Sequence, residues 1–159
     1  MKIRYYNQKD YNACIDIFKS NRPVYFAADK LPIFENWLNR QSDKRHSNKK
    51  VGAEHFYVLE NDGQVTACGG FYILLDTPVA GMAWGMVHSR YRKQGLGKIL
   101  FEYRINQVRI IYPQRDIILD TTQHTYRFFE KQGFSTTQIR KDFYEKGMDR
   151  YDMVLNQKK

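Results

Sequence analysis

Hydrophobic residues near the N-terminus follow first the period of a strand and then the period of a helix. Ile3 and Tyr5 alternate with more polar neighbours, which predicts a short strand. Asn7 can then cap a helix whose buried face is marked by helical spacing, at Tyr11, Cys14, Ile15 and Phe18. A second helix is predicted over 29–40, with Asp29 as its cap and Pro32 in its tolerant first turn.

The middle of the chain is predicted to form three strands joined by tight turns. Runs rich in apolar residues cover 56–60, 64–75 and 79–87. Turn sequences separate them, Asn61-Asp62-Gly63 and Asp76-Thr77-Pro78, so a three-stranded antiparallel meander is expected. Glycines inside these strands predict bulges or close approaches of the backbone, at Gly69, Gly70, Gly81 and Gly85.

The C-terminal part alternates helices with strands. A helix from Leu96 to a point before Pro113 is expected to bury the face formed by Leu96, Ile99, Leu100 and Tyr103. The apolar run 117–119 predicts a strand covered on both faces, and a short helix over 124–132 leads to strands over 134–139 and 151–155. We therefore predict a mixed α+β fold, a mostly antiparallel central sheet of about six or seven strands with about four helices on both faces.

Length and cysteine content narrow the class of protein. A chain of 159 residues has the size of one domain, so a single domain is predicted over 1–159. Cys14 and Cys68 lie in apolar patterns without the spacing of a metal site, so buried thiols in a reducing compartment are expected and no metal is. The N-terminus lacks a secretory signal, and no apolar stretch approaches the roughly 18 residues of a membrane span, which predicts a cytoplasmic protein without membrane contact.

The net charge of +9 at pH 7 leaves more than one interpretation. Basic chains can bind nucleic acid because they neutralise phosphates. Many of the positive charges crowd into the polar run 40–50, which is more typical of a solvated loop, with a docking patch for an acidic substrate as the alternative. No nucleic-acid-binding motif is present, so no specific nucleic-acid partner is expected.

The segment with the clearest chemistry is Arg92-Lys93-Gln94-Gly95-Leu96-Gly97, between the strand ending at Val87 and the helix opening at Leu96. The first amides of a helix lack intrahelical acceptors, the helix N-terminus favours an anion, and glycines permit a close approach. The segment therefore predicts a pyrophosphate site. No Gly-Lys-Ser/Thr follows, and the third glycine of a dinucleotide fingerprint is missing, so neither a P-loop nor a Rossmann site is expected.

This segment resembles Arg-x-x-Gly-x-Gly, the acyl-CoA signature of the GNAT superfamily of N-acyltransferases. The preceding Val87-His88-Ser89-Arg90-Tyr91 is similar to the family's Val-x-Pro-x-Tyr lead-in, and the segment 128–134, ending in Gly133-Phe134, is similar to its later helix-to-strand element. In detail the resemblance covers about residues 83–155. It implies a GNAT-like fold with two central strands splayed at the acyl-CoA site, acetyl-CoA as co-substrate, and a possible homodimer.

The resemblance also implies where acetyl-CoA binds. The thioester carbonyl would accept a hydrogen bond from the main chain at the end of the signature strand, where Val87 lies, and backbone amides around Gly95 would hold the pyrophosphate. The expected cofactor-binding residues are Met86, Val87, Arg92, Lys93, Gln94, Gly95, Leu96, Gly97 and Lys98.

The catalytic groups are less clear because the sequence departs from the family pattern. The family's usual tyrosine aligns with Phe129, which cannot donate a proton, and its usual asparagine aligns with Thr122. His124 and His88 are candidate bases, and Tyr126 is a candidate acid, although a capping or surface role suits the histidines and a packing role suits the tyrosine. Three further residues are open to a functional or a structural interpretation: Asp120 could orient a histidine or cap a helix, and Glu54 and His55 could border the acceptor pocket or form a strand-end pair.

Together these features predict an N-acetyltransferase that moves an acetyl group from acetyl-CoA to a primary amine by direct attack in a ternary complex. An acyl-cysteine route is less favoured because neither cysteine has an evident base nearby in sequence. The alternative is a catalytically silent acyl-CoA-binding sensor or scaffold, suggested by Phe129, and a basic nucleic-acid-binding domain ranks third.

The amine acceptor, a small molecule or a peptide, is not specified by the sequence. Aminoglycosides, polyamines, amino acids, peptide N-termini and protein lysines all remain open. Aromatic residues in the N-terminal third could line its pocket or form part of the core: Tyr25, Phe26, Phe34 and Trp37.

Overall fold

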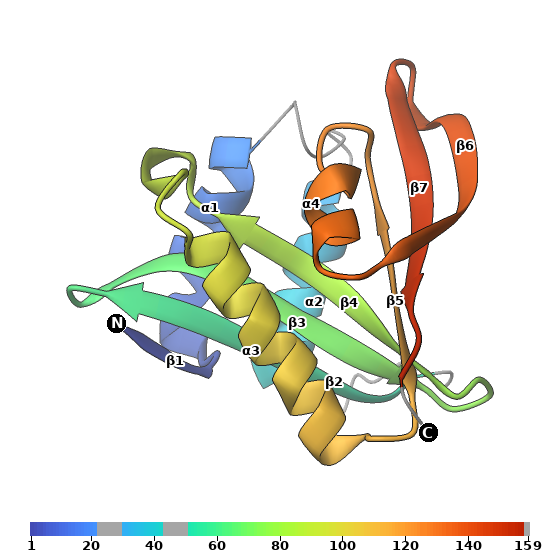
Figure 1. The fold of residues 1–159 in the computed structure, drawn as a ribbon. Coiled ribbons are helices and arrows are strands. Elements are labelled where there is room, and N and C mark those ends of the chain that lie inside the picture. Colours follow the sequence, from blue (N-terminus) through green and yellow to red (C-terminus); the bar gives the residue numbers. More distant parts are fainter. Residues whose placement is uncertain (22–29, 43–50, 158–159) are drawn as a thin grey trace.

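The computed structural model describes residues 1–21, 30–42 and 51–157, and it contains one seven-stranded sheet with helices on both faces (Figure 1). In chain order the strands are β1 (Lys2–Tyr5), β2 (Val51–Asn61), β3 (Gln64–Leu74), β4 (Val79–Val87), β5 (Asp116–Thr121), β6 (Ser135–Glu145) and β7 (Met148–Leu155). Their spatial order is β1-β2-β3-β4-β5-β7-β6. Neighbouring strands are antiparallel except β4 and β5, which run parallel. The predicted meander of β2, β3 and β4 is confirmed.

Helices cover the two faces of the sheet in pairs. Helices α1 (Tyr11–Asn21) and α2 (Leu31–Ser42) lie on one face, and α3 (Leu96–Ile111) and α4 (Tyr126–Lys131) lie on the other (Figure 1). Short 3-10 turns precede α1 and α3, at η1 (Gln8–Asp10) and η4 (Ser89–Tyr91). The predicted α+β class, with helices on both faces, is confirmed. The proposed cap Asp29 and the basic residues of 43–50 lie outside the described residues.

Among the described residues, a hydrophobic core lies on each face of the sheet, between the strands and the helices that cover them. The core under α1 and α2 contains stacked aromatic rings, such as Phe18 and Phe34 at a centroid distance of 5.6 Å. The core under α3 buries a different helix face from the one predicted, since Ile99 is 37% exposed. The buried residues of α3 are Leu96, Leu100, Phe101, Arg104, Ile105 and Val108. Arg104 follows Leu96 and Leu100 at a spacing of four residues on the buried face. A search for apolar residues at helical spacing does not find it, because arginine is charged.

The two cysteines come together in the core although they are far apart in sequence. Both are fully buried, as predicted, Cys14 on α1 and Cys68 on β3. Hydrogen bonding with Cys68, together with burial, raises the pKa of the Cys14 thiol well above its ordinary value. Cys14 is therefore held as a neutral thiol.

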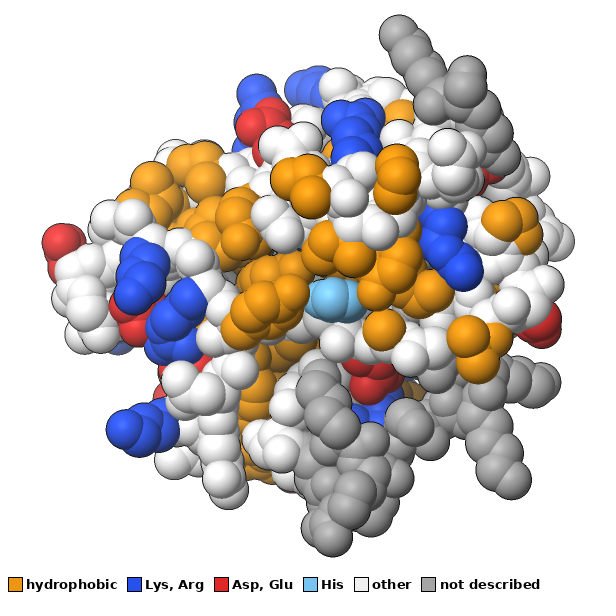
Figure 2. Space-filling view, turned by 90° about the horizontal axis from the view of Figure 1, so that it is seen from below, with side chains coloured by type: hydrophobic (Ala, Val, Ile, Leu, Met, Phe, Trp, Pro, Cys, Tyr) orange, Lys and Arg blue, Asp and Glu red, His pale blue; other side chains and the backbone are white. Residues whose placement is uncertain are grey.

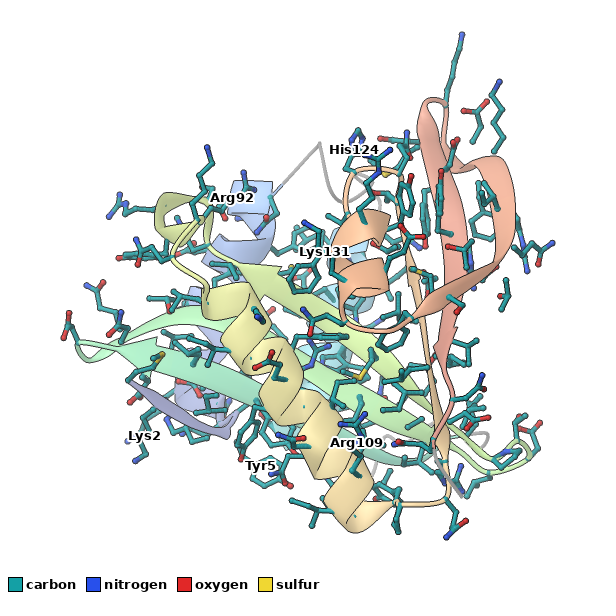
Figure 3. All side chains as sticks on the ribbon, viewed as in Figure 1. Lys2, Tyr5, Arg92, Arg109, His124 and Lys131 are labelled. Carbon is teal, nitrogen blue, oxygen red and sulfur yellow. The ribbon has the colours of Figure 1, made fainter. Side chains whose placement is uncertain are left out.

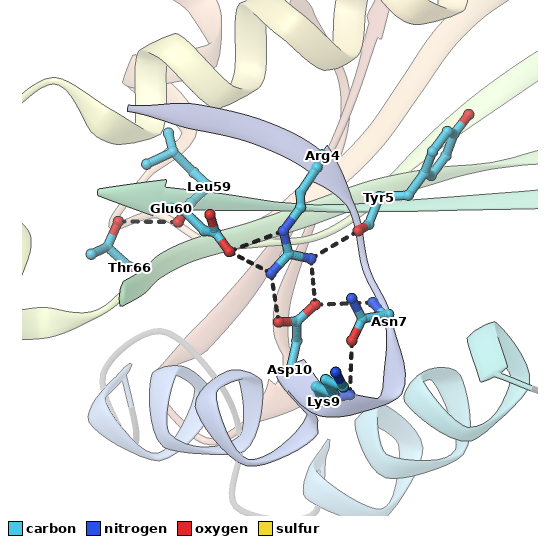
Figure 4. A network of polar contacts seen from close by, with 8 residues as sticks. All are labelled: Arg4, Tyr5, Asn7, Lys9, Asp10, Leu59, Glu60 and Thr66. Carbon is cyan, nitrogen blue, oxygen red and sulfur yellow. Dashed lines mark hydrogen bonds and ion pairs between the residues drawn. The ribbon is translucent and has the colours of Figure 1, made fainter. Parts of the chain in front are cut away.

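Arg4 joins the edge strand β1 to the start of the first helix (Figure 4). Its guanidinium donates to both carboxylate oxygens of Asp10 at 2.8 Å and to Glu60 of β2 at 2.7 and 3.0 Å. Asp10 also accepts from the Asn7 backbone amide in a capping box, and its side chain is only 6% exposed. Burial alone would raise the pKa of Asp10, but the hydrogen bonds from Arg4 and Asn7 hold it below its ordinary value.

We expect the D10N variant to lower the free energy of unfolding by about 1–3 kcal/mol at pH 7, because Arg4 loses its bidentate partner. A depressed pKa stabilises the fold above the unfolded-state pKa of about 3.9, and that contribution is lost as pH falls through the folded pKa. Urea unfolding at pH 7 and under acid conditions should therefore show the difference shrink with acidification. The exposed Asp16 of α1 provides the control, D16N, and an equal loss in both variants would contradict the prediction.

One surface region is apolar, on the face shown in Figure 2, where hydrophobic side chains surround a histidine. His55 hydrogen-bonds to the hydroxyl groups of Tyr5 and Tyr112, each at 3.1 Å. Among the described residues, no helix is both long and apolar enough to cross a membrane.

Candidate active site

The two parallel central strands, β4 and β5, separate toward their C-terminal ends. Parallel pairing of β4 with β5 is limited to Val79–Gly81 against Asp116–Ile118. Beyond that point β4 stays paired with β3, and β5 stays paired with β7. The predicted splay between two central strands is therefore present.

A bulge in β4 lies beside the splay. The register between β3 and β4 shifts between Cys68 and Gly70, opposite the stretch of β4 between Ala83 and Met86. Trp84, within that stretch, has a positive φ of 55°, a conformation that bulky residues rarely adopt. A bulge is therefore present at the glycines, as predicted, and it lies beyond the last β4–β5 pair.

A cavity of about 770 Å³ lies at the splay and is lined by residues from both faces of the sheet. On the α3 side it is lined by the loop before α3, by α3 itself and by Phe128 and Phe129 of α4. On the α2 side its lining includes Lys30, Ile33, Tyr72, Trp84, Asp120 and Tyr144. A cavity of this size and mixed lining is typical of a small-molecule site.

The glycine-containing loop presents free backbone donors to this cavity. Gly95 caps α3 in the left-handed conformation, with φ 77°, and no atom lies within 4 Å of the position of an added Cβ. Ile99 is the first residue of α3 with an intrahelical bond, to the carbonyl of Gly95 at 3.1 Å. Among the described residues, the amides of residues 95–98 have no hydrogen-bond acceptor. Free amides at a helix N-terminus are suited to bind an anion.

Most of the expected cofactor-binding residues gather around this cavity. Met86, Val87, Arg92, Lys93, Gly95, Leu96, Gly97 and Lys98 all line it. Gln94 is exposed and does not line it. The cavity therefore brings together the end of β4 and the start of α3.

The C-terminal end of α1 fixes this loop in place, which the sequence did not indicate. Buried Asn21 accepts from Arg92 at 2.7 Å and donates to the carbonyl of Val87 at 3.0 Å. The neighbouring Ser20 hydroxyl accepts from the Ser89 amide at 3.0 Å. Helix α1 thus connects the end of β4 to the glycine-containing loop before α3.

Of the three candidate acids and bases, His124 lines the cavity, whereas His88 and Tyr126 do not. Figure 3 shows Arg92 near the N-terminus of α3 and His124 near α4, and both residues line the cavity. His88 does not line it: its imidazole caps η4, accepting from the Arg90 amide at 3.1 Å. Tyr126 stacks on Tyr151 at 4.4 Å and also lies off the cavity wall.

Phe129 stands in the cavity wall at the position of the family's usual tyrosine. Its ring packs on Phe101 at 5.1 Å and on Phe134 at 6.3 Å. Hydroxyl groups enter the cavity from other positions, including Thr121 and Thr125, which hydrogen-bond to each other.

Asp120 is the carboxylate of the cavity wall on the α2 side. It accepts a hydrogen bond from the hydroxyl of Tyr144, which reaches it from β6. Tyr72 approaches from β3 across Gly81, where an added Cβ would lie 2.1 Å from the tyrosine ring. Burial and the negative charge of Asp120 raise the pKa of Tyr72 and of Tyr144, so both phenols stay protonated. No sequence signal pointed to Tyr144, whereas Gly81 did indicate a close approach.

Four residues suggested for the acceptor pocket lie elsewhere. Glu54 pairs with Arg40 at 3.0 Å, His55 hydrogen-bonds to Tyr5 and Tyr112, and neither Glu54 nor His55 lines the cavity. The interpretation of Glu54 and His55 as pocket residues is therefore wrong. Phe34 and Trp37 belong to the core between sheet and helices, and Tyr25 and Phe26 lie outside the described residues.

Comparison with known proteins agrees with this geometry. The GNAT acetyltransferase domain model matches residues 52–136. An amino-acid acetyltransferase from Vibrio vulnificus is 30% identical over 123 residues, which are 77% of this chain and 25% of that protein. The chain thus spans about a quarter of the length of the curated relatives it matches.

Solved structures share the fold. A ribosomal-protein-alanine N-acetyltransferase from Brucella melitensis superposes with a TM-score of 0.77 at 19% identity, covering 98% of this chain and 99% of that one. A GNAT family acetyltransferase from Elizabethkingia anophelis, with acetyl-CoA bound, superposes with a TM-score of 0.69 at 13% identity, covering 98% and 97%. With the family model matching more than half of its residues, the chain belongs to the GNAT family of acetyltransferases.

Proposed function

We propose that this protein is an N-acetyltransferase in which acetyl-CoA and a primary amine meet in the opening between β4 and β5. The observation that carries this proposal is the cavity itself, whose lining brings free amides on one side of the sheet together with the Asp120 carboxylate on the other. The arrangement matches one anionic and one cationic ligand that approach from opposite faces.

The residues on the α3 side fit acetyl-CoA. The amides of residues 95–98 would donate hydrogen bonds to the pyrophosphate, and Lys93 and Lys98 add positive charge nearby. The end of β4 offers its main chain to the acyl end. When bound, acetyl-CoA supplies an acetyl group already activated as a thioester. The protein itself has to orient the amine and to accept the protons that its ammonium group loses.

Asp120 is suited to bind the ammonium group of the acceptor. Its carboxylate lies in the cavity wall, and the Tyr144 hydroxyl holds it in place by donating one hydrogen bond. The aromatic faces of Tyr72, Trp84 and Tyr144 would favour a cation beside the carboxylate. Loss of a proton to Asp120 then frees the nitrogen lone pair for attack.

The overall transfer balances without another reactant. A bond forms between nitrogen and the acetyl carbon, and the carbon–sulfur bond breaks. Of the two protons that the ammonium group loses, one ends on the CoA sulfur and the other is released to solvent. His124, at the exposed rim of the same cavity, is the second candidate to accept a proton.

Direct transfer is favoured over an acyl-cysteine route. Cys68 lines the cavity, but its thiol donates to the Trp84 carbonyl at 3.8 Å and lies beside the Cys14 thiol. Among the described residues, no histidine or carboxylate hydrogen-bonds to Cys68. A thiol in this environment lacks the partner that would activate it.

The experiment is thiol release from acetyl-CoA, measured over a panel of amines together with acetyl-CoA binding by calorimetry. The panel should begin with free amino acids and alanine-containing peptides, because the matching relative is named an amino-acid acetyltransferase and the structural neighbour a ribosomal-protein-alanine N-acetyltransferase. Thiol release that depends on one class of amine is the expected result. Binding without release for any amine would favour the sensor or scaffold instead, and absence of binding would refute both.

A further inference from the structure

Arg104 is a buried cation at the bulge of β4 with no acidic partner. It lies on α3, it is 4% exposed, and it lines the cavity. Among the described residues no carboxylate lies within ion-pair distance of it, and its nearest titratable neighbours are Cys68 and Tyr57. A buried charge without a counterion is costly, and it therefore calls for a functional explanation.

The contacts of Arg104 span the place where the β3–β4 register breaks. Its Nη2 donates to the carbonyls of Gly70 and Ala83 at 3.0 and 3.4 Å, and its Nε donates to Gly70 at 3.3 Å. Gly70 and Ala83 are the last regular pair before the bulge. The guanidinium thus binds both strands at the edge of the bulge.

Two glycines make room for this side chain. A Cβ added to Gly69 would lie 2.8 Å from the Arg104 Cζ, and one added to Gly85 would lie 2.7 Å from Nη1. Both distances are too short for real contacts. These glycines, one on each strand, therefore bring the cation directly against the main chain of the bulge.

We propose that Arg104 is a positioning residue that holds the β4 bulge and, through its unbalanced charge, favours negative charge at the acyl end of the cavity. This role rests on the proposed function, because it assumes that acyl-CoA occupies the cavity. In aminolysis the carbonyl oxygen of the thioester gains negative charge, and a fixed cation in a low-dielectric site stabilises such charge. Burial lowers the pKa of Arg104 only to about 10, so the side chain stays charged at neutral pH.

The test compares two CoA derivatives that differ in charge at the acyl end. S-carboxymethyl-CoA carries a carboxylate there, and S-acetonyl-CoA is its neutral counterpart of similar shape. We expect the protein to bind the anionic derivative about tenfold more tightly by calorimetry, and the R104M variant to lose that preference. The R109M variant removes an exposed arginine from the same helix and should keep the preference.

The R104K variant separates charge from shape. A lysine buried without a carboxylate has a pKa depressed by up to several units, so its charge should be lost as pH rises from about 6 to 9. R104K should therefore prefer the anionic derivative at pH 6 and lose the preference by pH 9, whereas the parent protein keeps it throughout. If R104M fails to fold, G85A supplies the second route, because its methyl group displaces the guanidinium without removing it.

The outcomes distinguish this proposal from the proposed function. If the parent protein binds neither derivative, the acyl-CoA site itself is wrong. If it binds both equally, or if R104M and G85A keep the preference, the role of Arg104 is refuted while the acyl-CoA site stands. With an active amine, R104M should also lower kcat about 100-fold with little change in the KM for acetyl-CoA.

Discussion

The G95V variant should bind acetyl-CoA at least about 100-fold more weakly than the parent protein, a loss of about 2.7 kcal/mol. Gly95 adopts φ 77°, in the left-handed region, and it sits where the free amides of the α3 N-terminus face the cavity. A β-branched residue resists that conformation and places methyl groups where an anion must approach. Isothermal titration calorimetry with acetyl-CoA gives the affinity directly.

A control variant must distinguish the loss of acetyl-CoA binding in G95V from the effect of backbone strain on the fold. Gly63, in the turn between β2 and β3, has φ 78°, and an added Cβ there also meets no atom within 4 Å. G63V should therefore cost the fold a similar amount, about 1–2 kcal/mol, without weakening acetyl-CoA binding. Equal affinities in G95V and the parent protein would remove the basis for an anion site at this loop.

The D120N variant should lower kcat about 100-fold while leaving the affinity for acetyl-CoA within about twofold. Asparagine keeps the size of the side chain and can still accept from Tyr144, but it neither carries the negative charge nor accepts the ammonium proton. Steady-state thiol release with the active amine, and calorimetry with acetyl-CoA, measure the two quantities.

D116N provides the matched control on the same strand. Asp116 begins β5, accepts from the Gln157 amide at 2.9 Å and does not line the cavity. An H124A variant in the same assay tests the second candidate. Parent-like turnover in D120N together with a large loss in H124A would transfer the proton-accepting role to His124.

Local signals in the sequence were enough to identify the loop that we propose as the phosphate-binding side of the site. Glycines at a helix N-terminus act through backbone conformation, which depends on residues adjacent in sequence, so the loop at 92–98 could be identified without a structure. The bulge at β4 was likewise indicated by the glycines around it. The register shift beside Gly70 confirms the bulge, and the positive φ of Gly95 agrees with a glycine at the helix N-terminus, whereas phosphate binding by this loop stays a prediction.

The acceptor side could not be predicted in the same way because it is built by contacts across the sheet. Tyr144 comes from an exposed edge strand and meets Asp120 only because β6 folds back along β7. Arg104 lies on a helical stripe that otherwise holds apolar residues, and its partners are carbonyls on two other strands. Neither the Tyr144–Asp120 contact nor the contacts of Arg104 can be predicted from a short stretch of sequence, because their partners are far apart along the chain.

In the proposed ternary complex, acetyl-CoA and the amine occupy opposite sides of the opening between β4 and β5. If the amine binds as proposed, substitutions around Tyr72 and Tyr144 alter which amine is accepted without changing the loop proposed to hold the nucleotide. Acceptor choice and nucleotide affinity are then independently adjustable properties of one small scaffold. A chain built this way can acquire a new amine substrate through a few changes on a single face of its sheet.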